Sequence, residues 1–356
     1  MKTNLCLVAC FALVGIAWGE TPKLPGDRVA TIAFFEENVY GRKPDLSSFE
    51  KRSQVVDRGC WTGTRAIRRD VTLNTLTPWG ETNFTAVALI PSDASRGRVP
   101  CFVYISFESP DAILEQKQGV KHYRWPVNEI LEAGFATVAF DYQDAFPDRA
   151  KSVADWGASS VRPGNSWGAI STWALAASRV MDWVETVGEI DSGKVAVVGH
   201  SRLGKTALWV GATDERFAYA VVNDSGCLGA RASSFNLNGE TIEQITRVFP
   251  HWFAPNCAAR FAGKDKELPF DQHWLIATLA PRLVAVGSAE DDHWACPSGE
   301  HAGLDLARPA WGKVQERCHY HIRPGGHDIT SADWQDYISF AKKCGWLKTI
   351  RNNEWD

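Results

Sequence analysis

A serine held between two glycines is the residue best placed for chemistry, in the segment 199–204. The apolar, β-branched run Lys194–Val198 predicts a buried strand before it, and small and apolar residues at helical spacing follow from Lys205. A serine on a sharp strand-to-helix turn is typical of a nucleophile elbow. Gly199 and Gly204 remove Cβ atoms that would clash in such a turn, and the helix dipole points at a developing oxyanion. Ser201 is therefore the candidate nucleophile, and the alternative is a serine that only caps the helix.

A serine is a poor nucleophile at neutral pH and needs a base. His327 is the candidate base, because Gly325 and Gly326 before it permit a tight turn that brings the imidazole toward the serine. The alternative is a histidine that lies on the surface. His319 and His321 alternate along a predicted strand and fit a structural role, since no third metal ligand stands out near them.

Two carboxylates that follow predicted strands can orient His327 and stabilise its cation. Asp224 ends the strand Tyr219–Val222, and Asp292 follows the strand Val284–Gly287. The two acidic residues just before Asp292 are further candidates. Each carboxylate could instead cap a helix or lie solvated in a loop. The residues leave open which acid pairs with His327, or whether both do.

Two basic residues follow the serine on the predicted helix. The backbone N–H of Arg202 is the default oxyanion donor, and its side chain brings a permanent charge next to a reacting carbonyl. Lys205 lies one turn further along and could reach a substrate carboxylate. Together they suggest an anionic substrate such as a uronic acid. The alternatives are a salt bridge that fixes the helix for Arg202 and a solvated surface position for Lys205.

The elements that must position these residues alternate between buried strands and helices, which indicates a mostly parallel sheet with right-handed crossovers. An antiparallel start and an elbow at mid-chain predict an α/β-hydrolase, with a central sheet flanked by helices as a three-layer sandwich. In this fold Asp292 has the usual position of the acid. Residues 143–167 are interpreted as a surface excursion, and 228–280 as an insertion over the active site. The predicted strands are Ala66–Leu73, Thr82–Ile90, Pro100–Phe107, Gly134–Tyr142, Lys194–Val198, Ala218–Val222, Pro281–Gly287 and His319–Ile322; the predicted helices are Asp27–Tyr40, Trp125–Ala133, Ser171–Val187 and Ser331–Cys344.

Length and composition limit the class of protein. A positive residue, an apolar run and small residues predict a signal peptide over 1–19, so that 20–356 forms one exported catalytic domain, secreted or periplasmic. A net charge of −4 without a basic stripe argues against nucleic acid, and no later stretch is apolar enough for a membrane span. Nine cysteines, two of them in the leader, leave seven, for which disulfides are expected in an oxidising compartment. We expect a monomer without metal or cofactor.

Several motifs along the chain resemble the bacterial glucuronoyl esterases of carbohydrate esterase family 15. The family elbow reads G-x-S-R-x-G-K, and residues 199–205 match it at every fixed position. The other matching segments span nearly the whole mature chain: Val39–Arg42, Asn223–Cys227, Phe249–Phe253, Asp292–Trp294, Gly326–Asp328 and Asp333–Trp334.

The resemblance implies an α/β-hydrolase that cleaves esters between 4-O-methyl-glucuronate on glucuronoxylan and lignin alcohols, through an acyl-enzyme. It implies that Arg202 supports the oxyanion, that Lys205 and Trp294 hold the uronate, and that Glu240 holds a sugar hydroxyl. The family places its acid after either of two neighbouring strands or after both. Asp224 stands where many members carry glutamate, and the shorter side chain favours Asp292.

His200 stands where fungal members carry a cysteine, so their disulfide at that point is not expected. Two rival functions remain open at the level of sequence. One is an acetyl-xylan esterase or another carbohydrate esterase on the same fold. The other is a carbohydrate-binding protein without activity, because a complete set of residues shows only capability.

Overall fold

The computed structural model describes residues 22–24, 26–42, 51–61, 65–77, 80–92, 97–150, 163–234 and 239–347. The predicted signal peptide lies outside these described residues, as does the segment 78–79 between the predicted strands Ala66–Leu73 and Thr82–Ile90.

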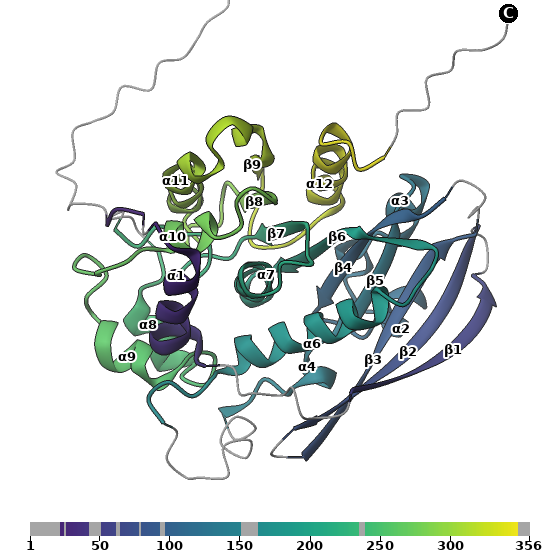
Figure 1. The fold of residues 1–356 in the computed structure, drawn as a ribbon, viewed down its shortest axis with the longest axis horizontal. Helices are drawn as coiled ribbons and strands as arrows, with labels where there is room; N and C mark the ends of the chain where they lie inside the picture. The colour runs from purple at the N-terminus through teal and green to yellow at the C-terminus, as the bar shows by residue number, and fades with distance from the viewer. Residues whose placement is uncertain are drawn as a thin grey trace, which may run out of the picture.

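One sheet of nine strands runs through the described part of the chain, in the order β1-β2-β3-β5-β4-β6-β7-β8-β9 (Figure 1). The first three strands and β5 pair antiparallel, and from β5 through β4 to β9 every pair is parallel. The antiparallel start and the parallel centre agree with the predicted α/β-hydrolase. The strands are β1 Lys51–Cys60, β2 Ala66–Thr77, β3 Gly80–Pro91, β4 Val99–Ser106, β5 Ala136–Asp141, β6 Ile190–His200, β7 Tyr219–Asn223, β8 Leu283–Ala289 and β9 Cys318–Arg323.

The helices lie on both faces of this sheet, so the three-layer arrangement is confirmed (Figure 1). Helices α6 and α7 pack in one apolar cluster with the sheet, and α3 and α12 pack in a second cluster on the opposite face. The helices are α1 Arg28–Phe35, η1 Glu36–Tyr40, α2 Pro110–Leu114, η3 His122–Arg124, α3 Val127–Glu132, α4 Tyr142–Ala145, α6 Ala169–Val184, α7 Arg202–Thr213, α8 Ile242–Val248, α9 Pro255–Phe261, α10 Gln272–Ala277, α11 Pro297–Ala307, η4 Arg308–Arg317 and α12 Ser331–Lys343.

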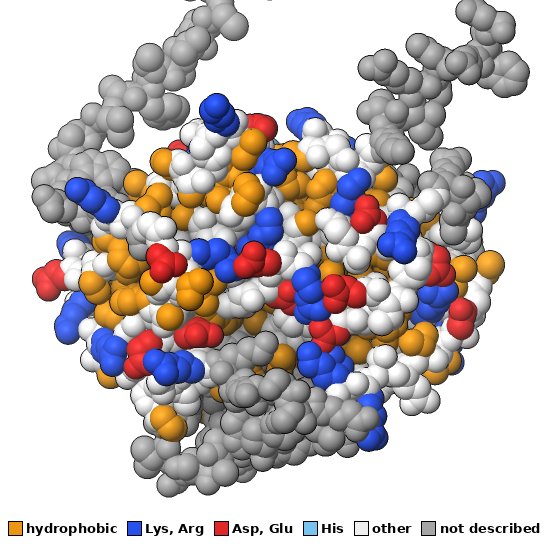
Figure 2. All heavy atoms as spheres, viewed as in Figure 1, with side chains coloured by type: hydrophobic (Ala, Val, Ile, Leu, Met, Phe, Trp, Pro, Cys, Tyr) orange, Lys and Arg blue, Asp and Glu red, His pale blue; other side chains and the backbone are white. Residues whose placement is uncertain are grey.

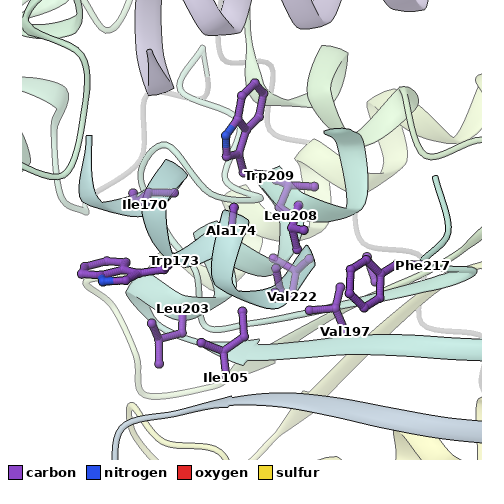
Figure 3. Packing of buried hydrophobic residues seen from close by; sticks show 14 of the residues in the cluster. Ile105, Ile170, Trp173, Ala174, Val197, Leu203, Leu208, Trp209, Phe217 and Val222 are labelled. Carbon is purple, nitrogen blue, oxygen red and sulfur yellow. The ribbon is translucent and has the colours of Figure 1, made fainter. Parts of the chain in front are cut away.

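Strand β6 is buried on both faces, which explains why its sequence is a continuous apolar run. Val195 and Val197 point into the cluster under α6 and α7, while Ala196 and Val198 point into the cluster under α3 and α12. Figure 3 shows Leu203 and other residues of α7 packed against strand residues of the first cluster. Each fully buried valine contributes about 1.5–3 kcal/mol, so the strand that leads to the serine is held firmly.

One stretch differs from the sequence-based expectation. Before residue 60 only the helix Asp27–Tyr40 was predicted, but the structure also has β1 there, whose side chains are all exposed. A strand without a buried face lacks the alternation by which strands are recognised in a sequence. Residues 228–280 connect β7 to β8 as expected of an insertion, and they contain α8, α9 and α10.

The expected disulfides are absent from the described part of the chain, where all seven cysteines are free. The physical reason is that most of these thiols serve as small apolar core groups. Five are buried, namely Cys101, Cys227, Cys257, Cys296 and Cys318, while Cys60 is exposed and Cys344 half-buried.

The surface mixes charges of both signs. Lys and Arg side chains are interspersed with Asp and Glu on the face drawn in Figure 2, and the whole chain carries a net charge of −4. No helix among the described residues has the length and apolar character needed to span a bilayer.

Candidate active site

The structure forms the predicted elbow between β6 and α7. Ser201 is the single residue between them and has φ 59° and ψ −126°, a strained conformation for a residue with a Cβ. A Cβ on Gly199 would lie 1.9 Å from the carbonyl oxygen of Leu203, and one on Gly204 would lie 2.8 Å from that of Asn223. Both glycines are therefore required for the turn that presents the serine.

A chain of hydrogen bonds joins the serine to one histidine and one acid. The Nε2 atom of His327 lies 2.9 Å from Oγ of Ser201, and its Nδ1 lies 2.5 Å from Oδ2 of Asp292. A carboxylate can only accept at Nδ1, so the imidazole carries its proton there and Nε2 accepts from the serine hydroxyl. Burial raises the pKa of Asp292, but the hydrogen bond and the charge of His327 outweigh burial and lower it. The three groups have the geometry of a nucleophile, a base and an orienting acid.

Arg202 extends from the first position of α7, next to the serine. Its Nη1 lies 2.5 Å from Oδ2 of Asp148, so the ion pair offered above as an alternative is present. Its guanidinium carbon lies 4.6 Å from the ring centroid of Trp252, 5.5 Å from that of Phe249 and 5.6 Å from that of Phe107. Charge and aromatic rings together hold the guanidinium beside the nucleophile.

A buried lysine and a buried glutamate lie on the β7–β8 side of the site. Lys205 donates a hydrogen bond from Nζ to the carbonyl of Ser225, and burial lowers its pKa while the charge of Glu240 raises it. Burial raises the pKa of Glu240, against the opposing effects of Lys205 and of a hydrogen bond with Trp294. The N–H of Glu240 also donates to the carbonyl of Trp294 at 3.1 Å. The indole of Trp294 is 56% exposed, so this group offers charge, hydrogen bonds and an aromatic surface to a ligand.

Comparison with known proteins decides the family. The family described as "Glucuronyl esterase, fungi" matches residues 108–314. A carbohydrate esterase from an unknown prokaryotic organism is 33% identical over 86% of this chain and 82% of its own. The chain belongs to the glucuronoyl esterases of carbohydrate esterase family 15. A solved glucuronoyl esterase from Solibacter usitatus is 30% identical, with a TM-score of 0.81 over 89% of this chain and 92% of that one.

The fungal relatives share a smaller part of the chain. The 4-O-methyl-glucuronoyl methylesterase of Podospora anserina is 30% identical over 51% of this chain, and the match covers 40% of that protein. The resemblance to the bacterial form that the motifs indicated is thus confirmed by relatives that match almost throughout.

The second candidate acid of this glucuronoyl esterase is bonded elsewhere. Asp224 is buried at the end of β7, and its Oδ1 accepts the N–H of Ala289 at 2.8 Å. Burial, with the nearby charges of Glu300 and Asp292, raises the pKa of Asp224 to about 9, although Arg323 opposes them. The carboxyl is therefore protonated at neutral pH, and of the two acids only Asp292 makes the hydrogen bond with His327.

Backbone and side-chain bonds tie the two acid-bearing loops together. Glu300 of α11 accepts from the N–H of Ser225 at 2.7 Å, from that of Gly226 at 2.9 Å and from the hydroxyl of Ser288 at 2.7 Å. The acidic residues just before Asp292 are exposed, and their backbone N–H groups bond to the carbonyls of Arg323 and Gly325 in the loop of the base. Neither of their carboxylates takes the place of Asp292.

His200 packs against the ring of His327. Its ring centroid lies 4.5 Å from that of His327, and its Nδ1 lies 2.7 Å from Oδ1 of Asn223. The Nδ2 of Asn223 donates to the hydroxyl of Tyr337 at 2.9 Å. A Cβ on Gly287 would lie 1.8 Å from that hydroxyl. Burial first, and then the charge of His327, lower the pKa of His200 well below its usual range, so its ring is neutral.

The residue after the base fixes the loop that carries it. Asp328 accepts from Nζ of Lys121 at 2.8 Å, from the hydroxyl of Tyr123 at 2.7 Å and from Nε of Arg124 at 2.6 Å. Burial raises the pKa of Asp328, but these three donors outweigh burial and lower it strongly. The loop around His327 is thereby attached to the segment that follows β4.

Metal ligation has two places to be considered. Within the described residues, Asp224, Asp292 and His327 are the one group whose ligand atoms all lie within 4.8 Å of one another. Two of them are already joined in the hydrogen-bonded chain that ends at the serine. His319 lies 2.6 Å from Asp336, and the metal-binding pair considered in the sequence instead faces the acids of α12.

Asp148 is the functional neighbour that the sequence did not indicate. It lies in the stretch interpreted as a surface excursion, yet its side chain is only 8% exposed. The available signal was its place a few residues beyond the end of β5, at the sheet edge where active-site residues collect. His251 and Trp252 lie in a segment that the sequence marked as similar to the family. Their hydrogen bonds to Asp148 were not predicted.

Proposed function

We propose that this protein is a serine esterase that hydrolyses esters between 4-O-methyl-glucuronic acid of glucuronoxylan and lignin alcohols. The observation that carries the proposal is the hydrogen-bonded chain Ser201–His327–Asp292. The buried pair Lys205 and Glu240 beside it supports a uronate as the acyl part. Membership in the glucuronoyl esterases supports the same substrate class.

Acylation uses the serine and the histidine in turn. Oγ of Ser201 attacks the ester carbonyl carbon while Nε2 of His327 takes the hydroxyl proton. The carbon–oxygen bond to the alcohol then breaks, and His327 gives the proton to the leaving oxygen. Asp292 holds the imidazole in position and stabilises its cation during both transfers.

Deacylation repeats these steps with water. His327 takes a proton from the water as its oxygen attacks the acyl carbon. The bond to Oγ of Ser201 breaks, the proton returns to Oγ, and the uronic acid leaves. One ester and one water are consumed, and one acid and one alcohol are formed.

The charge that develops on the carbonyl oxygen is stabilised by Arg202. Its backbone N–H lies at the N-terminus of α7, and its guanidinium adds a full positive charge. On the acyl side, we assign Lys205 to the uronate, Glu240 to a sugar hydroxyl and Trp294 to the face of the sugar ring. Lys205 and Glu240 are buried and Trp294 is exposed on the same side of the site, which supports this assignment.

We also propose that the enzyme acts outside the cytoplasm as a monomer and as one catalytic domain. The leader pattern in residues 1–19 supports export. The continuous sheet supports a single domain. In this proposal residues 228–280 cover the active site, since Glu240, Phe249 and His251 of that segment lie near the elbow residues.

The test compares two substrates with two proteins. Hydrolysis of benzyl glucuronate and of acetylated xylan is measured for the wild type and for Ser201→Ala. We expect serine-dependent release of glucuronic acid from the first substrate. Release of acetate alone would move the protein to the acetyl esterases, and a Ser201→Ala variant that keeps a tenth of the activity would reject Ser201 as nucleophile.

A further inference from the structure

We propose that Asp148 is a positioning residue that holds the guanidinium of Arg202 in the orientation needed to stabilise the oxyanion. This inference rests on the proposed function, because it assigns Arg202 to the reacting carbonyl. It adds a residue from outside the family motifs, 54 positions before Arg202 in the chain.

Both oxygens of the Asp148 carboxylate are fully occupied. Oδ1 accepts from Nε2 of His251 at 2.7 Å and from Nε1 of Trp252 at 2.8 Å. Oδ2 accepts from Nη1 of Arg202 at 2.5 Å and from the hydroxyl of Tyr142 at 3.2 Å. Four donors from four residues leave this buried carboxylate one orientation, so it is a fixed point to which a flexible arginine can be attached.

The carboxylate also keeps its charge. Burial raises the pKa of Asp148, but the hydrogen bonds from His251 and Trp252 and the charge of Arg202 outweigh burial and lower the pKa to about 2. The carboxylate is therefore ionised at neutral pH and can pair with Arg202. The Asp148 side chain is 8% exposed and that of Arg202 is 26% exposed, so the pair is largely shielded from solvent.

One donor of the Arg202 guanidinium makes no hydrogen bond with the described residues. The Nε atom of Arg202 is buried and has no hydrogen-bond partner in the described part of the chain. A buried donor without a partner is unusual and is one of the features found at catalytic sites. The aromatic rings of Phe107, Phe249 and Trp252 contact the guanidinium but offer it no hydrogen-bond acceptor, so its direction depends on Asp148.

Charge and geometry make opposite predictions for the loss of Asp148. A negative charge beside the oxyanion opposes its stabilisation, so if charge alone mattered, Asp148→Asn would raise kcat. If positioning matters, the same change frees a long side chain with several rotatable bonds and lowers kcat. Pre-organised donors in a water-poor site are worth far more than mobile ones, so we expect the geometric effect to win.

The test is a double-mutant cycle on benzyl glucuronate. We expect Asp148→Asn to lower kcat by about 10- to 100-fold with KM changed less than about threefold, because the removal of a whole oxyanion donor costs about 100- to 1000-fold. In an Arg202→Ala background, we expect Asp148→Asn to cost less than about twofold more, since the two residues act as one unit. A rise in kcat, an unchanged kcat, or an equal loss in both backgrounds would overturn the proposal.

The matched control is Tyr142→Phe, which removes the weakest of the four donors and leaves the ion pair. We expect its kcat to stay within about twofold of the wild type. If Asp148→Asn does not fold, as judged by thermal melting, the cycle is repeated with Asp148→Glu, which keeps the charge but displaces it. Its loss must again vanish in the Arg202→Ala background. If glucuronate release does not depend on Ser201, the proposed function itself fails; release that depends on Ser201 but ignores Asp148 rejects only this inference.

Discussion

The ends of two neighbouring strands carry an acid each, and the two acids have opposite properties. Asp292 follows β8, bonds to His327 and has a lowered pKa. Asp224 follows β7, one strand away, and burial and neighbouring acids raise its pKa to about 9. Both lie where the fold presents catalytic groups. Both acids therefore have a suitable position at the end of a strand, and the charges around each one decide which acid is ionised.

The difference has a local cause. Asp292 has a partner that becomes a cation during turnover, and such a partner favours the carboxylate. Asp224 has Glu300 and Asp292 nearby, and its one hydrogen bond from Ala289 does not compensate for burial among like charges. Arg323 lies 3.7 Å away, but its Nε is bonded to Asp333.

The largest expected effect comes from Asp292→Asn. The amide cannot act as the anionic acceptor at Nδ1 of His327, so the imidazole loses its tautomer and its stabilised cation. We expect kcat on benzyl glucuronate to fall by about three to four orders of magnitude with little change in KM. A loss smaller than about tenfold would show that Asp224 serves as the acid.

The next effect concerns stability and pH. The raised pKa of Asp224 means that the native state keeps a proton that the unfolded chain releases above about pH 4. The unfolding free energy contributed by this group therefore falls as pH rises and stops falling near pH 9. Between pH 6 and 8 the fall is at most about 2–3 kcal/mol.

Asp224→Asn removes this dependence, because the amide does not titrate. We expect the difference in unfolding free energy, variant minus wild type, to become more positive from pH 6 to pH 8 in urea melts. The control is Asp291→Asn, whose side chain is exposed in the same loop as Asp292. A difference that does not change with pH would mean that Asp224 is ionised in the folded protein.

A smaller effect is expected on activity. The side chain of asparagine has the shape of the protonated carboxyl that Asp224 carries at neutral pH. We therefore expect Asp224→Asn to lower kcat by less than about tenfold, far less than Asp292→Asn. Equal losses in the two variants would mean that both carboxylates serve the histidine.

The smallest effect is that of Glu300→Gln. Its charge is the largest electrostatic contribution to the raised pKa of Asp224 after burial. The glutamine can keep the bonds to Ser225 and Gly226 through its oxygen while its amide donates to Ser288. We expect the pH at which stability stops falling to move down from about 9, measured with the same urea melts. An unmoved end point would exclude Glu300 as a cause and leave burial and the other nearby carboxylates, such as Asp292.

The sequence singled out Ser201 and His327 because each is marked locally. Ser201 lies in a turn that its own glycines permit, and His327 follows two glycines at the end of a strand. The choice between the acids was not local, because it depends on Glu300 and His327, which reach Asp224 and Asp292 from other elements. The fold was also predictable from local patterns, because the central strands are continuous apolar runs.

Other features of the structure had no recognisable signal in the local sequence. Asp148 acts on a residue 54 positions away, and its stretch is polar and rich in turn formers, as exposed loops are. Strand β1 has no buried side chain, so no pattern in its sequence distinguishes it from a loop. The number of cysteines and the predicted export suggested disulfides. Most of the described cysteine side chains are instead buried as free thiols that pack as small apolar groups.

The missing side chain of Gly287 has a consequence for laboratory evolution of this enzyme. Any Cβ there would push the hydroxyl of Tyr337 away from Asn223, and Asn223 holds the ring that supports the base. In a library screened for activity on esters of new alcohols, variants at this position are expected to be inactive, although Gly287 has no side chain to contact a substrate. Codon randomisation should therefore leave Gly287 unchanged.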